Sequence, residues 1–194
     1  MVRLFTALLA AAVLSGCCEE RRVPEKKADA AGPALVFTDS EGRECEPLAT
    51  DGRKATVLLF LMHDCPVANA TSPALARVVK DFAERGVQFF GVYATETAEE
   101  VNRHRKEYGL TFPCLTDKAQ ELARRTGAAR VPEAAVLSPA GELLYRGRID
   151  DRAVSLGVTR PQAQREDLRL ALEAVLAGRK PEPQFTEVVG CYLP

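Results

Sequence analysis

An unbroken apolar run at positions 57–62 gives way to two polar residues, and Cys65 follows them. The run is too short to cross a membrane and is typical of a strand that is buried on both faces. Apolar residues then recur at helical spacing over positions 72–82. The pattern therefore predicts a buried strand that delivers Cys65 to the first turn of a helix. Pro66 suits the first helical position, where a missing N–H costs nothing.

Strands and helices alternate along the rest of the chain. The turn at 138–141 joins two strands into an antiparallel hairpin, whereas the strands around the earlier helices are expected to be parallel. This order implies an α/β fold with a mixed sheet and helices on both faces. The expected strands are 34–38, 57–62, 87–92, 111–115, 131–137 and 142–148, and the expected helices are 72–82, 95–108, 117–126 and 162–177.

The N-terminus has the pattern of a secretory signal. A short positive region with Arg3 precedes an apolar stretch at 4–14, and Leu-Ser-Gly-Cys then ends at Cys17. These four residues resemble the bacterial lipobox, whose cysteine carries a lipid; the alternative is a short buried helix beside an incidental cysteine. We expect a protein of the bacterial envelope that is lipid-anchored at Cys17 and faces the periplasm or the exterior. The expected divisions are a signal peptide at 1–16, a flexible tether at 17–33 and a domain at 34–194, within which 161–194 form the last helix and the tail.

Composition narrows the functional classes. The chain has 194 residues and a net charge of −1, which allows one compact domain with a sizeable core. No basic excess points to nucleic acid, and no cofactor is expected. Outside the apolar N-terminal stretch, no segment is long enough to cross a bilayer.

The cysteines point to redox chemistry. The chain has six, and with Cys17 used for a lipid, an odd number remains in an oxidising compartment. At least one thiol is then free or joined to another molecule, which fits a redox protein better than a closed disulfide framework. The remaining five are Cys18 in the tether, Cys45 in a charged segment that is expected near the surface, Cys65, Cys114 and Cys191.

The placement of Cys65 favours its reactive form. The positive end of a helix and its free N–H groups stabilise a thiolate. His63 would add to this effect when charged, whereas Asp64 would oppose it, and both are equally compatible with solvated loop residues. His104 lies between two arginines on a polar helix and is expected to be exposed. Asp150 and Asp151 are expected to form surface ion pairs.

The motif Asp64-Cys65-Pro66-Val67-Ala68-Asn69, the stretch from Tyr145 to Asp151 and the pair Gly190-Cys191 carry a resemblance. The chain resembles the thioredoxin-like superfamily and, more narrowly, bacterial redoxin-domain proteins of the alkyl hydroperoxide reductase and thiol-specific antioxidant type. The resemblance covers residues 35–194 and implies a three-layer sandwich with an additional C-terminal helix and tail. It also implies that Pro132 is a cis-proline that lies against the reactive cysteine and helps bind an extended partner chain. Asn69 and Pro66 are expected to support the site as members of the motif.

The second thiol of a disulfide exchange must come from elsewhere in the chain. Thioredoxin-like proteins usually carry it three residues after the first, where this chain has Ala68. Counted from Pro181, an extended tail reaches about 30 Å, and a domain of this size has a radius of gyration of roughly 15 Å, so Cys191 can fold back to Cys65. The alternatives are that Cys191 belongs to a frayed end, or that Cys114, more simply a buried strand residue, is the partner.

Three functions remain in competition. The first is thiol–disulfide exchange with protein or small-molecule thiols and disulfides, in which Cys65 attacks and Cys191 resolves. The second is a thiol peroxidase, which becomes unlikely because the proline and threonine that bind peroxide in peroxiredoxins correspond to Leu58 and Met62. The third is a non-enzymatic Cu(I)-binding or chaperone protein, with Cys65, Cys191 and His63 as ligands.

Overall fold

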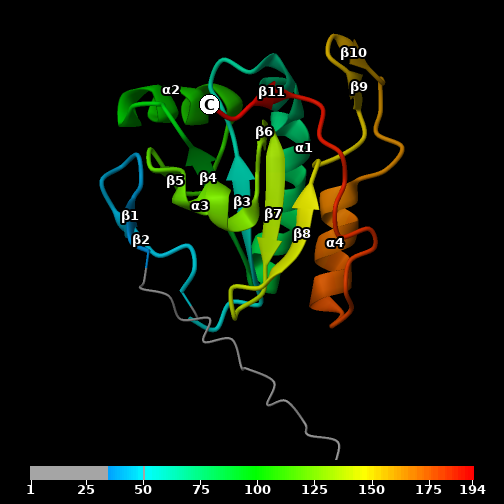
Figure 1. Cartoon of the computed structure of the whole chain (residues 1–194), viewed down its shortest axis with the longest axis horizontal. Helices are drawn as coiled ribbons and strands as arrows, with labels where there is room; N and C mark the ends of the chain where they lie inside the picture. The colour runs from blue at the N-terminus through cyan, green and yellow to red at the C-terminus, as the bar shows by residue number, and fades with distance from the viewer. Residues whose placement is uncertain (1–34, 50) are drawn as a thin grey trace, which may run out of the picture.

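The computed structural model describes residues 35–49 and 51–194 (Figure 1). The expected signal peptide, the tether and Cys17 therefore lie outside the described residues. A five-stranded sheet has the order β5-β4-β3-β7-β8, and β3 occupies its centre. Its strands are β3 (Ala55–Phe60), β4 (Val87–Tyr93), β5 (Cys114–Thr116), β7 (Glu133–Leu137) and β8 (Leu143–Gly147).

The central strand β3 is buried along its whole length. It pairs in parallel with β4 and antiparallel with β7, and β8 continues the antiparallel half. A strand that is covered on both faces needs apolar side chains in both directions, which explains why the run at 57–62 does not alternate. The predicted mixed sheet is confirmed.

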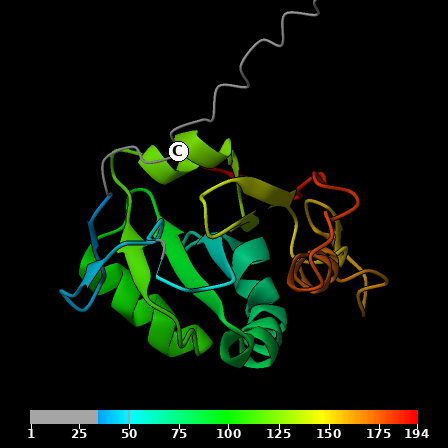
Figure 2. The same cartoon turned by 90° about the horizontal axis from the view of Figure 1, so that it is seen from below.

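Helices cover both faces of the sheet. Figure 2 shows α1 and α2 on one face and α3 on the other, and α4 packs against α1, β7 and β8. The helices are α1 (Pro66–Phe82), followed by a 3-10 turn at Ala83–Arg85, then α2 (Ala98–Tyr108), α3 (Glu121–Thr126) and α4 (Asp167–Leu176). This arrangement confirms the predicted α/β class. No helix within residues 35–49 and 51–194 is long and apolar enough to cross a membrane.

Local sequence explains where the first two helices begin. Cys65 is the N-cap residue of α1 and Pro66 is its first residue, so the proline stands where an N–H has no helical partner. Thr97 caps α2 in a reciprocal capping box with Glu100, whose side chain accepts from the Thr97 N–H at 2.8 Å. The start of α1 agrees with the prediction, whereas α2 begins at Ala98 rather than at residue 95.

The region before α4 differs from the prediction. Residues 162–166 were expected to be helical, but the buried Asp151 carboxylate accepts from the N–H groups of Gln164 at 2.7 Å and Arg165 at 3.0 Å and holds them as a loop. Ahead of this loop lies an unpredicted hairpin of β9 (Ala153–Ser155) and β10 (Val158–Thr159). A second short ribbon joins β1 (Phe37–Thr38) and β2 (Glu44–Cys45).

The C-terminal tail is an ordered part of the sheet region. The Arg146 N–H of β8 donates to Gln184 O at 2.9 Å, and the Thr186 N–H donates back to Arg146 O at 3.1 Å. The tail then crosses to β6 (Arg130–Val131), a short strand separated from β7 by Pro132. There β11 (Cys191–Tyr192) pairs antiparallel with β6. Figure 1 shows this red segment close to the start of α1.

Candidate redox site

Cys65 lies where the chain leaves β3 and enters α1. Its side chain is fully buried, and its Sγ donates to the carbonyl oxygen of Val131 at 3.5 Å. The Cys65 carbonyl accepts from the Asn69 N–H at 3.0 Å as the first turn of the helix forms. The thiol therefore stands at the N-terminal end of α1.

Pro132 forms the opposite wall of the site. The Val131–Pro132 peptide bond is cis, as the resemblance implied, and both residues are buried. Their segment brings the Val131 carbonyl to Cys65 on one side and to the tail on the other. One short segment therefore contacts both cysteine-bearing parts of the chain.

The tail brings Cys191 to the same place. Cys191 is the register partner of Val131 in the β11–β6 pair. Gly190 allows this close approach, because a Cβ at this position would lie 2.8 Å from the Val131 carbonyl carbon, still closer to its oxygen, and 3.3 Å from Pro132 Cδ. Carbon atoms in contact normally stand about 3.5–4.0 Å apart, so a larger residue does not fit. The Gly-Cys pair is thus explained by packing against the Val131–Pro132 segment.

The two thiols affect each other. Interaction with the Cys65 side chain is the main cause that raises the pKa of Cys191 to about 11, and burial and the charge of Asp64 add to it. Cys191 consequently keeps its proton at neutral pH. All four cysteines in the described part of the chain are free thiols, so this is the dithiol arrangement of the pair.

The two sulfurs differ in access. Cys65 is fully buried, whereas Cys191 is half-buried. A bulky molecule therefore does not reach Cys65 in this arrangement. Arg130 holds the tail in place, since its guanidinium donates to Gly190 O at 3.3 Å and stacks 4.0 Å from the ring centroid of Tyr192.

The residues before Cys65 are held by buried partners. The His63 N–H donates to Glu96 Oε1 at 3.1 Å, and His63 Nδ1 lies 3.4 Å from the same oxygen. The Asn69 side-chain amide donates to His63 O at 3.0 Å. Asp64 and Pro66 are exposed at the rim. The predicted neighbours of Cys65 thus surround it, although His63 contacts Glu96 rather than the sulfur.

Two functional neighbours were missed or misjudged from sequence. The prediction that His104 is exposed is wrong: it is 3% exposed, and its Nε2 lies 2.8 Å from Asn69 Oδ1. Its burial could have been inferred from its helical spacing to Val101, which is also buried. Glu96, which is 3% exposed, gave no signal in the sequence.

The remaining predicted residues lie apart from the sulfur pair. Cys114 is a buried residue of β5, as expected, and burial raises its pKa to about 12. Cys45 is half-buried and burial raises its pKa. Asp150 and Asp151 are not surface residues but buried ones. Asp151 does pair with Arg160 at 3.2 Å, whereas Oδ2 of Asp150 has no hydrogen-bond partner.

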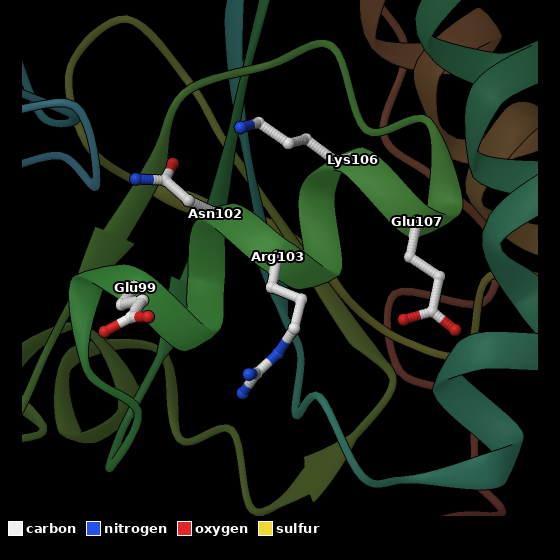
Figure 3. Close-up of a pocket in the computed structure, with 5 residues that line it drawn as sticks. All are labelled: Glu99, Asn102, Arg103, Lys106 and Glu107. Carbon is white, nitrogen blue, oxygen red and sulfur yellow. The ribbon is translucent and has the colours of Figure 1, made fainter.

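The structure gives no support to a metal site or a peroxide site among the described residues. Within the described residues, no three His, Cys, Asp or Glu side chains gather in a metal-binding group, and this includes the set Cys65, Cys191 and His63. Leu58, at a position where peroxiredoxins bind peroxide, is a core residue of β3. Figure 3 shows a polar pocket along α2, in which Asn102 and Lys106 project to one side of the helix and Arg103 and Glu107 to the other. Its lining contains no thiol.

Comparisons with known proteins show the family of the chain. A model of the AhpC/TSA family matches residues 24–146. Thiol-disulfide oxidoreductase ResA of Halalkalibacterium halodurans is 28% identical over 110 residues, which cover 57% of this chain and 62% of that protein. The chain thus spans less than two thirds of this relative.

Solved structures share the fold. A hypothetical protein from Sinorhizobium meliloti superposes with a TM-score of 0.70 at 28% identity and covers 82% of this chain and 89% of its own. The thioredoxin domain of a thiol-disulfide oxidoreductase from Bacteroides vulgatus superposes with a TM-score of 0.52 at 16% identity and covers 59% and 83%. The three-layer, thioredoxin-like fold is confirmed.

Proposed function

Since this chain belongs to the AhpC/TSA family, we propose that it is a thiol–disulfide oxidoreductase whose redox pair is Cys65 and Cys191. The observation that carries the proposal is the pairing of β11 with β6, which brings the half-buried Cys191 against the buried Cys65 at the start of α1. The similarity to ResA proteins supports the same reaction class. The substrates are disulfides and thiols of proteins or small molecules.

The pair performs exchange in two steps. The Cys65 thiolate attacks one sulfur of a substrate disulfide, the substrate S–S bond breaks, and the leaving sulfur departs as a thiolate. Cys191 then passes its proton to the first substrate thiolate and attacks Cys65 Sγ, so the mixed disulfide breaks and the second substrate thiolate is released. The substrate gains two electrons, and the protein is left with a Cys65–Cys191 disulfide that an external thiol reduces. The first step requires displacement of the tail, because Cys65 is covered.

Peroxide reduction is the weaker alternative within the same family. A peroxidase of this type polarises the peroxide with a hydroxyl and neighbouring donors beside the thiolate. The corresponding positions hold Leu58 in the core and Met62, which is half-buried. Neither side chain donates a hydrogen bond to a peroxide oxygen. Disulfide exchange needs no such donor, which is why the geometry favours it.

Mass mapping of the air-oxidised, unreduced protein tests the redox pair. We expect one peptide pair joined through Cys65 and Cys191, lost on reduction and lost in Cys65→Ser or Cys191→Ser. Both variants should also lose reduction of a protein disulfide such as that of insulin, whereas Cys45→Ser, a matched change at a half-buried cysteine outside the site, should keep it. Recovery of Cys65 and Cys191 as free thiols after oxidation would refute the proposal.

We further propose that the protein is anchored to an envelope membrane through a lipid on Cys17. The support is the signal-like N-terminus with its Leu-Ser-Gly-Cys ending. Full-length protein should partition into detergent from membranes of the producing bacterium, and Cys17→Ser should release it into the aqueous phase. An unchanged distribution of Cys17→Ser would contradict lipidation.

A further inference from the structure

Tyr93, His104 and Asn69 form a continuous hydrogen-bonded chain that ends at the turn before Cys65; Tyr93 and His104 are buried and Asn69 is half-buried. Tyr93 closes β4, His104 lies on α2 and Asn69 on α1, so the chain ties three elements together. The Tyr93 hydroxyl lies 2.7 Å from His104 Nδ1, and His104 Nε2 lies 2.8 Å from Asn69 Oδ1. The Asn69 side-chain nitrogen completes the chain at 3.0 Å from His63 O.

The direction of every hydrogen bond follows from donor chemistry. A backbone carbonyl only accepts, so the Asn69 amide must present its NH2 group to His63 O and its oxygen to His104. An amide oxygen also only accepts, so His104 Nε2 must carry a hydrogen. In a neutral imidazole Nδ1 then accepts, and the Tyr93 hydroxyl donates to it. Burial lowers the pKa of His104, which agrees with a neutral ring.

We propose that His104 is a positioning residue of the redox site, which acts through Asn69 to fix the turn that presents Cys65. Four hydrogen bonds hold the backbone of the turn from His63 to Cys65. Glu96 accepts from the His63 N–H, Asn69 binds the His63 carbonyl with its side chain and the Cys65 carbonyl with its N–H, and the Cys65 N–H donates to Met62 O at 3.3 Å. Asn69 supplies two of these four contacts. The proposal deepens the assignment of Cys65 and Cys191 as a redox pair and rests on it.

The contribution of His104 is to fix one orientation of the Asn69 amide. Without the His104 N–H, the Asn69 oxygen loses its partner and the amide gains other rotamers. The turn is then less ordered, and closing the disulfide must order it again, which costs entropy. The equilibrium of the Cys65–Cys191 pair with glutathione consequently moves toward the dithiol.

Variants of the full chain separate this role from general stability. His104→Phe keeps an aromatic ring but removes both ring nitrogens. Asn69→Ala removes the side-chain amide, and His104→Gln restores a hydrogen-bond donor toward Asn69. Tyr93→Phe is the matched control, because it removes the other buried hydrogen bond of His104 and leaves the Asn69 contact in place. Each protein is equilibrated with glutathione buffers to obtain the disulfide equilibrium constant, and its melting temperature is recorded.

We expect His104→Phe and Asn69→Ala each to lower the equilibrium constant for disulfide formation by about 3- to 10-fold, the size of one net hydrogen bond. The double variant with His104→Phe and Asn69→Ala should have an equilibrium constant no lower than that of Asn69→Ala alone. His104→Gln should recover most of the loss seen in His104→Phe. Tyr93→Phe should change the constant by less than about 2-fold, although its melting temperature falls by a similar amount. A shift in Tyr93→Phe equal to that in His104→Phe, or no shift in His104→Phe, would overturn the proposal.

A second measurement keeps the two proposals apart. Hydrogen exchange over residues 62–69 of the reduced protein should accelerate in His104→Phe and not in Tyr93→Phe, whatever the redox behaviour of the protein. If the wild-type chain forms no Cys65–Cys191 disulfide, the proposed redox pair is wrong. Hydrogen exchange alone then decides the role of His104. Unchanged exchange in His104→Phe would count against the positioning role.

Discussion

Gly190→Ala tests whether the docking of the tail controls the redox pair. A Cβ on residue 190 would lie 2.8 Å from the Val131 carbonyl carbon and 3.3 Å from Pro132 Cδ. Carbon atoms in contact stand about 3.5–4.0 Å apart, so β11 must withdraw from β6 by roughly 1 Å. No left-handed backbone is required at this glycine, so the substitution acts through this contact alone.

The displacement carries Cys191 away from Cys65. A disulfide demands an S–S distance of about 2.05 Å and a narrow range of Cβ separations, so a shift of this size must be reversed each time the bond forms. Overpacking of this kind costs about 1–3 kcal/mol, which corresponds to a roughly 5- to 150-fold lower equilibrium constant for the disulfide. The melting temperature should change little, because the central sheet does not depend on β11.

The assay is equilibration of full-length protein with glutathione buffers, acid quenching and quantification of the two forms by mass. Glu187→Ala is the control, since residue 187 is an exposed part of the same tail. We expect the control to match wild type and Gly190→Ala to retain more dithiol at every buffer ratio. An equilibrium constant for Gly190→Ala within about 2-fold of wild type, well below the cost of overpacking, would show that the tail does not need this contact.

Two further outcomes follow from buried groups and a third follows from a helix cap. Cys114, whose pKa is raised to about 12 by burial, should stay unmodified by iodoacetamide in the folded protein at pH 8 and react after unfolding; labelling in the native state, read by peptide mass, would contradict its burial. Burial raises the pKa of Asp150 from 3.8, so the folded state holds this proton more tightly than the unfolded chain. The free energy of unfolding is thus lowered as pH rises from about 4 through the folded-state pKa, and Asp150→Asn should raise the melting temperature more at pH 7 than at pH 4; an equal effect at both would refute this. Thr97→Ala removes the cap of α2 and should cost about 0.5–2 kcal/mol in urea unfolding, with Thr95→Ala, a neighbouring threonine outside the capping box, as a control.

Short-range patterns in this chain were sufficient to predict the central architecture. The apolar run at 57–62 and the Cys-Pro pair are each decided within a few residues, and the structure agrees with both. The predicted start of the last helix was wrong because of a contact between residues far apart in the sequence. Asp151 binds the N–H groups of Gln164 and Arg165, 13 and 14 residues further along the chain, and a helical pattern does not include such a partner.

The same distinction applies to the site. Cys65 and its motif could be identified because the chemistry of a helix start is local. The contacts of His104 could not be predicted, although its spacing to Val101 indicated burial, because its partners Tyr93 and Asn69 lie 11 and 35 residues away. Glu96 was missed since a lone acidic residue after a strand has no distinguishing neighbours. His104 and Glu96 support the site through long-range hydrogen bonds, which local sequence patterns do not predict.

The position of the second thiol gives this site a property that a Cys-x-x-Cys helix does not have. In such a motif both sulfurs lie on one rigid turn, so the geometry of the disulfide is set by the helix itself. Here Ala68 fills that place within the core, and Cys191 arrives on a strand whose contacts are Val131 and Arg130. The same Val131 carbonyl accepts from the Cys65 thiol, so tail docking and the placement of Cys65 share one backbone group. A change that moves Val131 therefore affects both sulfurs at once, and a change at Gly190 reaches Cys65 through this carbonyl as well as through Cys191.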